Sequence, residues 1–158
     1  MLVVRKARRS DLEKIFQMIC ELADFEKLNR PDRSGMKRFE KDLFERRRIN
    51  AFIAFLEGEP AGYAIYFNTY STFLLRPTLY LEDIFVRVVF RNGGVGKALM
   101  KRLAKEALKS GCGRMEWLVL GWNKGAIEFY RKLGAIQLAD WKFFRLERDG
   151  MERLASAE

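Results

Sequence analysis

A strand, a glycine-rich loop and the start of a helix follow one another between Tyr80 and Gly96, and this stretch most constrains the fold. The segment Leu79 to Val88 is mostly apolar and β-branched, which predicts a strand. Apolar residues recur at helical spacing from Lys97 to Ser110, so a helix is predicted there. The chain therefore contains at least one strand–loop–helix unit, and the loop is its most distinctive part.

The loop reads Arg91-Asn92-Gly93-Gly94-Val95-Gly96 and is followed by Lys97. The free N–H groups and the dipole of a helix N-terminus attract anions, and glycines let a phosphate approach the backbone. A Walker A loop is excluded because Arg91 stands where its first glycine belongs and Ala98 where its hydroxyl belongs. The loop does not match the dinucleotide fingerprint GxGxxG either, because Leu99 stands where the third glycine belongs. The pattern that remains, Arg-x-x-Gly-x-Gly, predicts a phosphate-binding loop of another kind.

The other elements are predicted from hydrophobic periodicity and turn residues. Strands are expected at Leu2–Ala7, Ala51–Leu56, Pro60–Thr69, Met115–Leu120 and Trp141–Glu147, and helices from Ser10 to about Phe25, from Ser34 to about Arg47, and after Asn123 until Gly134. Ser10 with Glu13 forms a capping-box pattern, and a short tail follows the Arg148–Gly150 turn. Early hairpins and a later β-α-β-α order predict an α/β (α+β) fold, in which about four helices flank a mixed sheet of about six to seven strands.

Composition limits the chemistry of the 158 residues, which we expect to form one domain, 1–158. The absence of histidine excludes Ser-His-Asp and Cys-His catalysis and histidine metal sites. Cys20 and Cys112 lack zinc-ligand spacing, so we expect no metal. We expect no membrane span and no signal peptide, because apolar runs are short and Arg5 follows Met1 closely, and the expected location is the cytoplasm.

The net charge of +9 leaves several partners open. Lys27 to Arg48 holds nine basic and four acidic residues, a net charge of +5. This segment is interpreted as a solvated helix face with Arg46, Arg47 and Arg48 near the helix C-terminus. Nucleic acid, an anionic membrane surface and an anionic cofactor are the alternatives that the charge allows.

A second motif gives the phosphate loop a family context. Asn123-Lys124-Gly125-Ala126-Ile127-Glu128-Phe129-Tyr130-Arg131-Lys132-Leu133-Gly134 resembles the N-x-x-A-x-x-F-Y-x-x-x-G segment of the GNAT superfamily of N-acetyltransferases, and the loop resembles the coenzyme A loop of that superfamily. The resemblance covers nearly the whole chain and implies the GNAT fold with acetyl-CoA as co-substrate. It implies that coenzyme A is bound by Ile84, Phe85, Val86, Arg91, Asn92, Gly93, Gly94, Val95, Gly96, Lys97, Asn123 and Ala126.

A narrower resemblance is to the diamine (spermidine/spermine) acetyltransferases. It rests on Glu21-Leu22-Ala23-x-Phe25-Glu26, on Tyr80-Leu81-Glu82-Asp83-x-Phe85-Val86, and on Trp122-Asn123 with Phe129-Tyr130. It implies that Tyr130 is the general acid, that Glu82 assists the acceptor amine, and that Phe25, Glu26, Glu116, Trp117 and Leu118 contact the acceptor. Asn92 replaces a usual glycine, and Gly125-Ala126 replaces more polar residues.

The residues of this region are suited to direct transfer of the acetyl group from acetyl-CoA to an amine. Glu82 can hold the acceptor ammonium and take its proton, while Asp83 is expected on the opposite face of the strand. A backbone N–H near Phe85 or Val86 is the expected oxyanion donor, and Tyr130 can protonate the leaving thiolate. A small primary amine (a polyamine, a diamine or a thialysine-like amino acid) is the expected acceptor.

Two alternatives to this function remain. One is acetylation of a protein lysine or an N-terminal α-amine. The other is a basic protein of GNAT fold that binds nucleic acid or another partner, which the +9 charge suggests. The family likeness also suggests a homodimer, with Trp141–Glu147 as a candidate edge strand.

Overall fold

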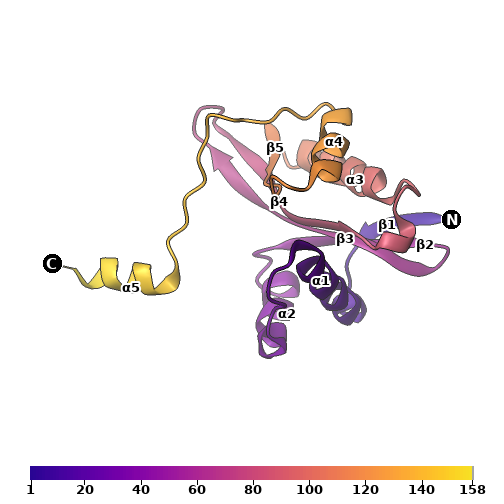
Figure 1. Ribbon diagram of the computed structural model, residues 1–158, viewed down its shortest axis with the longest axis horizontal. Coiled ribbons are helices and arrows are strands. Elements are labelled where there is room, and N and C mark those ends of the chain that lie inside the picture. The colour runs from indigo at the N-terminus through magenta and orange to yellow at the C-terminus, as the bar shows by residue number, and fades with distance from the viewer. Residues whose placement is uncertain (158) are drawn as a thin grey trace. The chain divides into compact units, whose positions relative to one another are not determined.

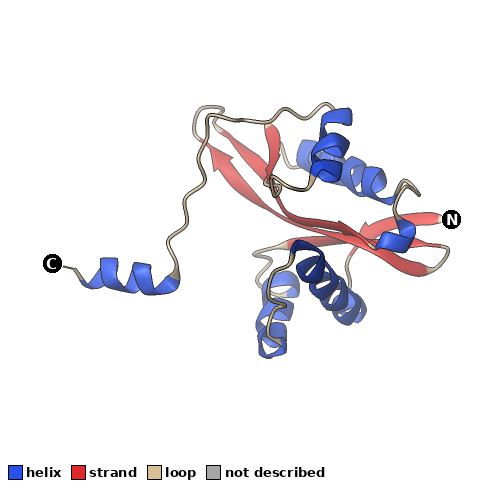
Figure 2. Ribbon diagram, viewed as in Figure 1, coloured by secondary structure: helices blue, strands red, loops and turns tan. Residues whose placement is uncertain are grey.

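Five strands form one mixed sheet in the computed structural model, which describes residues 1–157 (Figures 1 and 2). The strands are β1 (Leu2–Lys6), β2 (Asn50–Leu56), β3 (Glu59–Ser71), β4 (Arg76–Val86) and β5 (Arg114–Trp117). They lie in sequence order; neighbours from β1 to β4 are antiparallel, whereas β4 and β5 are parallel. The early hairpins and the later parallel pair were both predicted and are confirmed.

Five α-helices accompany the sheet. They are α1 (Leu12–Glu26), α2 (Met36–Phe44), α3 (Val95–Lys109), α4 (Lys124–Lys132) and α5 (Arg148–Ser156), with short 3-10 turns at Arg9–Asp11, Arg33–Gly35 and Val88–Phe90. The chain divides into two compact units, residues 1–118 and the residues from 119 onward. Within the first unit, α1 and α2 cover one face of the sheet and α3 covers the other (Figure 1).

Alternating side chains of the central strands fill two cores. Toward α1, Tyr63 and Phe85 pack with Ile15, Met18 and Ile53 in one buried cluster. Toward α3, the rings of Phe52 and Tyr66 stack with centroids 5.2 Å apart, and Arg102 of α3 lies over Phe52. Because a strand turns alternate residues to opposite faces, these two cores hold β2, β3 and β4 rigidly between helices.

The first helices begin differently from the prediction. Asp11, and not the predicted Ser10, is the N-cap residue of α1, but its carboxylate accepts the backbone N–H of Arg8, before the helix, at 2.8 Å and makes no hydrogen bond to the first turn of α1. Asp11 is only 2 % exposed and also accepts two bonds from Arg5, which hold the pKa of its carboxyl below the usual range. Likewise Asp32, and not Ser34, caps the turn before α2. A carboxylate is a stronger acceptor than a hydroxyl, which explains why Asp32 caps this turn.

The C-terminal prediction was wrong. Trp141–Glu147 is not a strand but an extended loop, and the expected tail after Arg148 is helix α5. The sheet therefore has five strands in place of six to seven. Aromatic residues favour strands, but a strand exists only where a neighbouring strand accepts its hydrogen bonds, and this segment has none among the described residues.

No helix within residues 1–157 has both the length and the apolar content to cross a membrane. The prediction of one domain for residues 1–158 stays a prediction.

Candidate functional site

Strand β4 carries an irregularity at Glu82. The register pairs Ile65 with Asp83 and Tyr66 with Leu81, so Glu82 is left without a partner on β3. A β-bulge of this kind re-aims a side chain and is frequent beside active sites. The Glu82 side chain is exposed. The sequence predicted Glu82 as a site residue but gave no sign of the bulge.

Strand β4 also loses its second neighbour at the same place. The parallel pairing with β5 runs from Thr78 opposite Arg114 to Leu81 opposite Trp117 and stops there. The backbone groups of β4 after Leu81 that face β5 have no ladder partner in this sheet. The predicted cofactor residues Ile84, Phe85 and Val86 lie on this unpaired stretch, where an extended amide ligand could add as a strand.

The predicted phosphate loop joins β4 to α3. Gly94 is the N-cap of α3 with a positive φ of 78°, and Asn92 has a positive φ of 64°. A Cβ built on Gly94 would meet no atom within 4 Å, so open space lies in front of the loop. The first N–H groups of α3 have no acceptor inside the helix, and together with the helix dipole they form an anion site. The loop therefore fits a phosphate ligand.

Arg91 links this loop to α1. Its Nε donates to the carbonyl of Val86 at 3.2 Å, and its guanidinium lies 4.6 Å from the centroid of the Phe25 ring. Phe25 was predicted as an acceptor-site residue and Arg91 as a cofactor residue, and the structure brings them together. The end of α1 thus adjoins the phosphate loop.

Two carboxylates, Glu82 and Glu26, act on a third, Asp83, beside this point. Burial, and then the charges of Glu82 and Glu26, raise the pKa of Asp83 to about 6. Tyr63, which is fully buried, donates its hydroxyl to Asp83 Oδ2 at 3.4 Å. Burial also raises the pKa of Glu26 at the end of α1. We call Glu26, Glu82 and Asp83 the acidic cluster; it is a site suited to a cationic ligand.

Sequence reasoning ranked Asp83 below Glu82 and missed Tyr63. Regular strand alternation predicted Asp83 on the face opposite Glu82, but the bulge at Glu82 interrupts this alternation. The structure shows that Asp83 lies beside the buried Tyr63 hydroxyl. The sequence does place Tyr63 and Asp83 on two consecutive predicted strands. However, their contact depends on the register between β3 and β4, which the sequence does not reveal.

The predicted residues of β5 extend the site along the sheet. Glu116 lies opposite Tyr80 and forms an ion pair with Arg114 at 2.6 Å. Burial, then Glu82, then Glu116 raise the pKa of Tyr80, so these three side chains interact. Trp117 ends the strand, and Leu118 follows it with an exposed side chain.

The second unit carries the remaining predicted residues. The Asn123 side chain accepts the backbone N–H of Ala126 at 3.2 Å and caps helix α4. The motif residues Asn123 and Ala126 therefore have a structural role in starting the helix. Tyr130 lies on α4 with its ring 5.4 Å from that of Phe129, and both are half-buried.

Four of the nine basic residues between Lys27 and Arg48 form ion pairs with acidic residues. Arg30 binds Asp24 and Arg33 binds Glu13, each through two hydrogen bonds. Arg46 and Arg48 follow the end of α2, and both form ion pairs with Asp42 of that helix. These ion pairs offset part of the positive charge of the segment.

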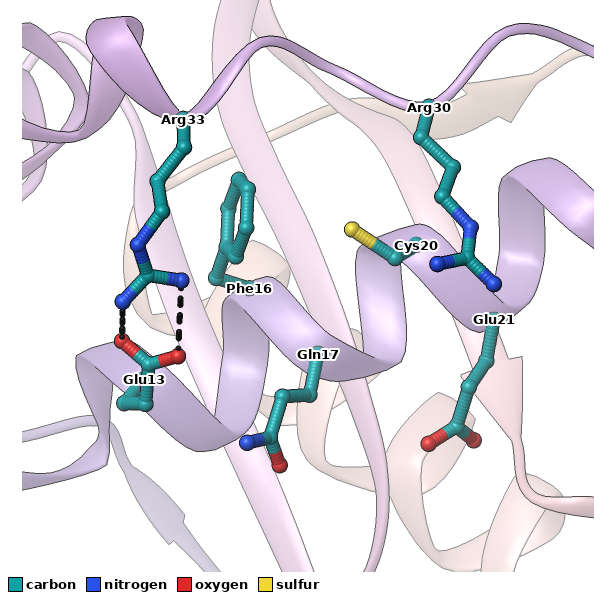
Figure 3. Close-up of a pocket in the computed structure, with 7 residues that line it drawn as sticks. All are labelled: Glu13, Phe16, Gln17, Cys20, Glu21, Arg30 and Arg33. Atoms are coloured by element: carbon teal, nitrogen blue, oxygen red, sulfur yellow. Dashed lines mark hydrogen bonds and ion pairs between the residues drawn. The ribbon is translucent and has the colours of Figure 1, made fainter.

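A cavity of about 390 Å³ lies between α1 and this segment (Figure 3). It is lined by Glu13, Phe16, Gln17, Cys20, Glu21, Arg30 and Arg33. None of the predicted site residues lines it. Its arginines and Glu13 are held in ion pairs, and Glu21 binds Arg87 at 2.8 Å. The lining of this cavity shares no residue with the acidic cluster.

Within residues 1–157, no three histidine, cysteine, aspartate or glutamate residues gather as a metal site would require.

Comparison with known proteins gives this geometry a context. Residues 13–135 match the acetyltransferase (GNAT) family. The chain is 36% identical over 165 residues to a thialysine N-epsilon-acetyltransferase of Sus scrofa, covering 97% of this chain and 96% of that protein. It is 34% identical over 100 residues to the human spermidine/spermine N(1)-acetyltransferase-like protein 1, covering 61% of this chain and 14% of that protein.

The fold has close counterparts among solved structures. AAC(6′)-Iy, in complex with the bisubstrate analogue CoA-S-monomethyl-acetylneamine, superposes with a TM-score of 0.78. The two chains are 22% identical, with 92% of this chain and 97% of that chain covered. This likeness concerns the fold alone. The predicted GNAT fold and the predicted resemblance to diamine acetyltransferases are both confirmed.

Proposed function

The chain belongs to the GNAT family of acetyltransferases, and on this premise we propose that it acetylates the side-chain amine of a small lysine-like amino acid or diamine. One observation carries the proposal. Two carboxylates of the acidic cluster, Glu82 and Asp83, lie on strand β4, and the phosphate loop follows the same strand. A cationic acceptor and an anionic donor would thus meet on one short stretch of chain.

Acetyl-CoA is the proposed acetyl donor. The open space at Gly94 and the free N–H groups at the start of α3 support binding of its pyrophosphate. The unpaired edge of β4 after Leu81 supports binding of its pantetheine amides. Arg91 and Lys97 add positive charge beside the loop. These roles are proposals for each residue named.

The acceptor must lose a proton before it attacks. An alkylammonium has a pKa near that of lysine, about 10.4, so it reaches the site charged. We assign Glu82 and Asp83 to hold it, and Glu82, which is exposed, to pass its proton to water. The neutral amine then attacks the thioester carbonyl, a backbone N–H near Phe85 or Val86 stabilises the oxyanion, and the C–S bond breaks.

Tyr130 is the proposed general acid for the departing thiolate. A phenol with a pKa of about 10 is well matched to an alkyl thiol, whose pKa is about 8.5. The Tyr130→Phe change should therefore lower turnover strongly and leave the affinity for coenzyme A nearly intact. Phe129→Leu, next to it on α4, is the matched control, because it alters the packing of Tyr130 without removing a proton donor. Equal turnover in wild type and Tyr130→Phe would remove Tyr130 from this role.

The proposed class of acceptor is supported by the thialysine-specific name of a relative and by the negative charge of the acidic cluster. The Sus scrofa relative is named for thialysine, an amino acid with a side-chain amine. The proposed acceptor carries a primary amine on a chain short enough to reach the acidic cluster. Phe25, Glu26, Glu116, Trp117 and Leu118 are the proposed acceptor contacts.

Release of free thiol from acetyl-CoA tests the proposal. The panel is thialysine, ornithine, lysine, putrescine, spermidine and a lysine-containing peptide. We expect the highest kcat/KM for a small amino acid or diamine. A higher value for the peptide would replace this acceptor class with protein lysine, and no release with any amine would overturn the proposed activity.

We further propose a cytoplasmic homodimer. The family likeness supports this assembly. The mass in solution measures the assembly directly.

A further inference from the structure

Tyr63 on β3 is a buried tyrosine whose hydroxyl contacts a carboxylate of the proposed acceptor site. In the register of the sheet Tyr63 lies opposite Phe85 of β4, and Asp83 stands two positions before Phe85, so the three side chains share one face. The Tyr63 hydroxyl therefore reaches Asp83 diagonally and donates to its Oδ2 at 3.4 Å. Tyr63 is fully buried whereas Asp83 is half-buried, so a ligand can reach the carboxylate but not the hydroxyl.

The surrounding core fixes the position of the Tyr63 hydroxyl. The Tyr63 ring packs with Met18 of α1 in one buried cluster, and its centroid lies 6.4 Å from that of the Phe85 ring. A side chain packed in this way has little room to change its rotamer. Burial, and then Asp83 and Glu26, raise the pKa of Tyr63 well above its usual range, so the hydroxyl keeps its proton at neutral pH. Tyr63 is therefore a fixed hydrogen-bond donor.

The groups around Asp83 mostly oppose its negative charge. Burial, Glu82 of β4 and Glu26 of α1 all raise the pKa of its carboxyl, which reaches about 6. The hydrogen bond from Tyr63 lowers that pKa, and within residues 1–157 no basic side chain acts on the carboxyl. The thiol of Cys20 on α1 acts on Tyr63 and not on Asp83. Among the described residues, Tyr63 is thus the group that favours the charged form of Asp83.

We propose that Tyr63 is a positioning residue for the acceptor: its hydroxyl holds the Asp83 carboxylate charged and oriented for an incoming ammonium ion. The hydroxyl binds Oδ2 and leaves Oδ1 to accept a hydrogen bond from the ammonium ion. This inference rests on the proposed function, in which Asp83 holds the acceptor amine. Once bound, the ammonium ion itself favours the charged carboxylate, so Tyr63 acts on capture of the acceptor and little on turnover.

The Tyr63→Phe variant tests this through kcat/KM for thialysine, expressed as the ratio of variant to wild type. The variant keeps the ring and loses only the donor, so the pKa of Asp83 should rise from about 6 to about 7. The ratio should then fall to about one fifth at pH 6 and stay near one at pH 8.5, while kcat at saturating thialysine changes less than about twofold. The ratio cancels the proton loss of the amine itself, because both proteins share it.

Tyr66→Phe is the matched control. Tyr66 also lies on β3 and is only 3% exposed, but it stacks on Phe52 in the core toward α3. Its hydroxyl has no hydrogen-bond partner within residues 1–157. This change removes a buried hydroxyl without affecting Asp83, so the ratio should stay near one at both pH values. An equal loss in Tyr63→Phe and Tyr66→Phe would overturn the proposal.

A double-mutant cycle separates positioning from packing. In an Asp83→Asn background, Tyr63→Phe should change kcat/KM at pH 6 by less than about twofold, because the carboxylate through which Tyr63 acts is gone. The same loss with and without Asp83 would show that Tyr63 acts only through the core and would overturn the proposal. Circular dichroism checks that each variant keeps the fold.

A titration without substrates tests Tyr63 separately from the acetyl transfer. Carbon-13 NMR of chains labelled at the aspartate carboxyls follows Asp83 directly, and its signal is assigned by its loss in Asp83→Asn. We expect a midpoint near pH 6 in the wild type and in Tyr66→Phe, and near about pH 7 in Tyr63→Phe. An unmoved midpoint in Tyr63→Phe would overturn the role of Tyr63. A wild type that releases no thiol would instead overturn the proposed function, and this titration would still decide whether Tyr63 controls the charge of Asp83.

Discussion

The loop after β4 and the middle of β4 attract opposite charges, and the chain builds them in different ways. The loop presents helix N–H groups, Arg91 and Lys97, all from consecutive residues. The acidic cluster instead combines the end of α1 with β4, more than fifty positions apart in sequence. A locally built anion site thus lies next to a cation site that only tertiary packing assembles.

This difference predicts that a substitution can disable the phosphate loop without disabling the acidic cluster, and the reverse. Gly94→Val should raise the dissociation constant for coenzyme A at least a hundredfold, because its side chain would enter the open space before the loop and strain a φ of 78°. Titration calorimetry with coenzyme A measures this constant. Gly58→Val is the matched control, since Gly58 has a φ of 84°, open space around it and a place in the β2–β3 turn. Equal loss of affinity in both variants would show that strain alone is responsible.

Asp83→Asn should stabilise the fold at neutral pH. A carboxyl whose pKa rises to about 6 on folding stabilises the fold below its unfolded pKa of about 3.9, and this contribution is lost as the pH rises through 6. Removing the charge should raise the free energy of unfolding by up to about 3 kcal/mol at pH 8 and change it little at pH 4. Urea denaturation at both values checks this. An equal difference at pH 4 and pH 8 would contradict the buried charge.

Arg91→Gln should have a small effect on both sites. Its guanidinium is exposed and rests on Phe25, so its loss should cost roughly 1 kcal/mol, a fivefold weaker binding of coenzyme A. The KM of the acceptor should rise by a similar factor because Phe25 loses its neighbour. Calorimetry and initial rates measure the two effects. A hundredfold loss for coenzyme A would show that Arg91 turns toward the phosphate.

The same comparison explains how far the sequence could predict the site. Arg91 to Lys97 follow one another, so their spacing alone indicated the loop and the helix it begins. The bulge at Glu82 depends on the β3–β4 register, and the interaction of Asp83 with Tyr63 depends on β3 passing beneath α1. No local pattern records either contact. Thus Glu82 was identified through the family resemblance, whereas the surroundings of Asp83 required the structure.

Prediction of the fold from the sequence was limited in the same way near the C-terminus. Element order, hairpins and the parallel pair were predicted because each depends on nearby residues and turns. Trp141–Glu147 has strand composition, but a strand requires a neighbouring strand, and this segment has none in the sheet that the described residues form. The helix caps Asp11 and Asp32 were missed because a nearby serine also fitted the capping pattern.

Initial rates of Asp83→Asn test the central claim most directly. With thialysine and acetyl-CoA varied independently at pH 8, the account predicts that the KM for the amine rises at least tenfold while the KM for acetyl-CoA stays within twofold. The reason is that the acidic cluster holds the acceptor and the loop holds the donor. An unchanged KM for the amine, or a parallel rise for acetyl-CoA, would contradict two separate sites on β4.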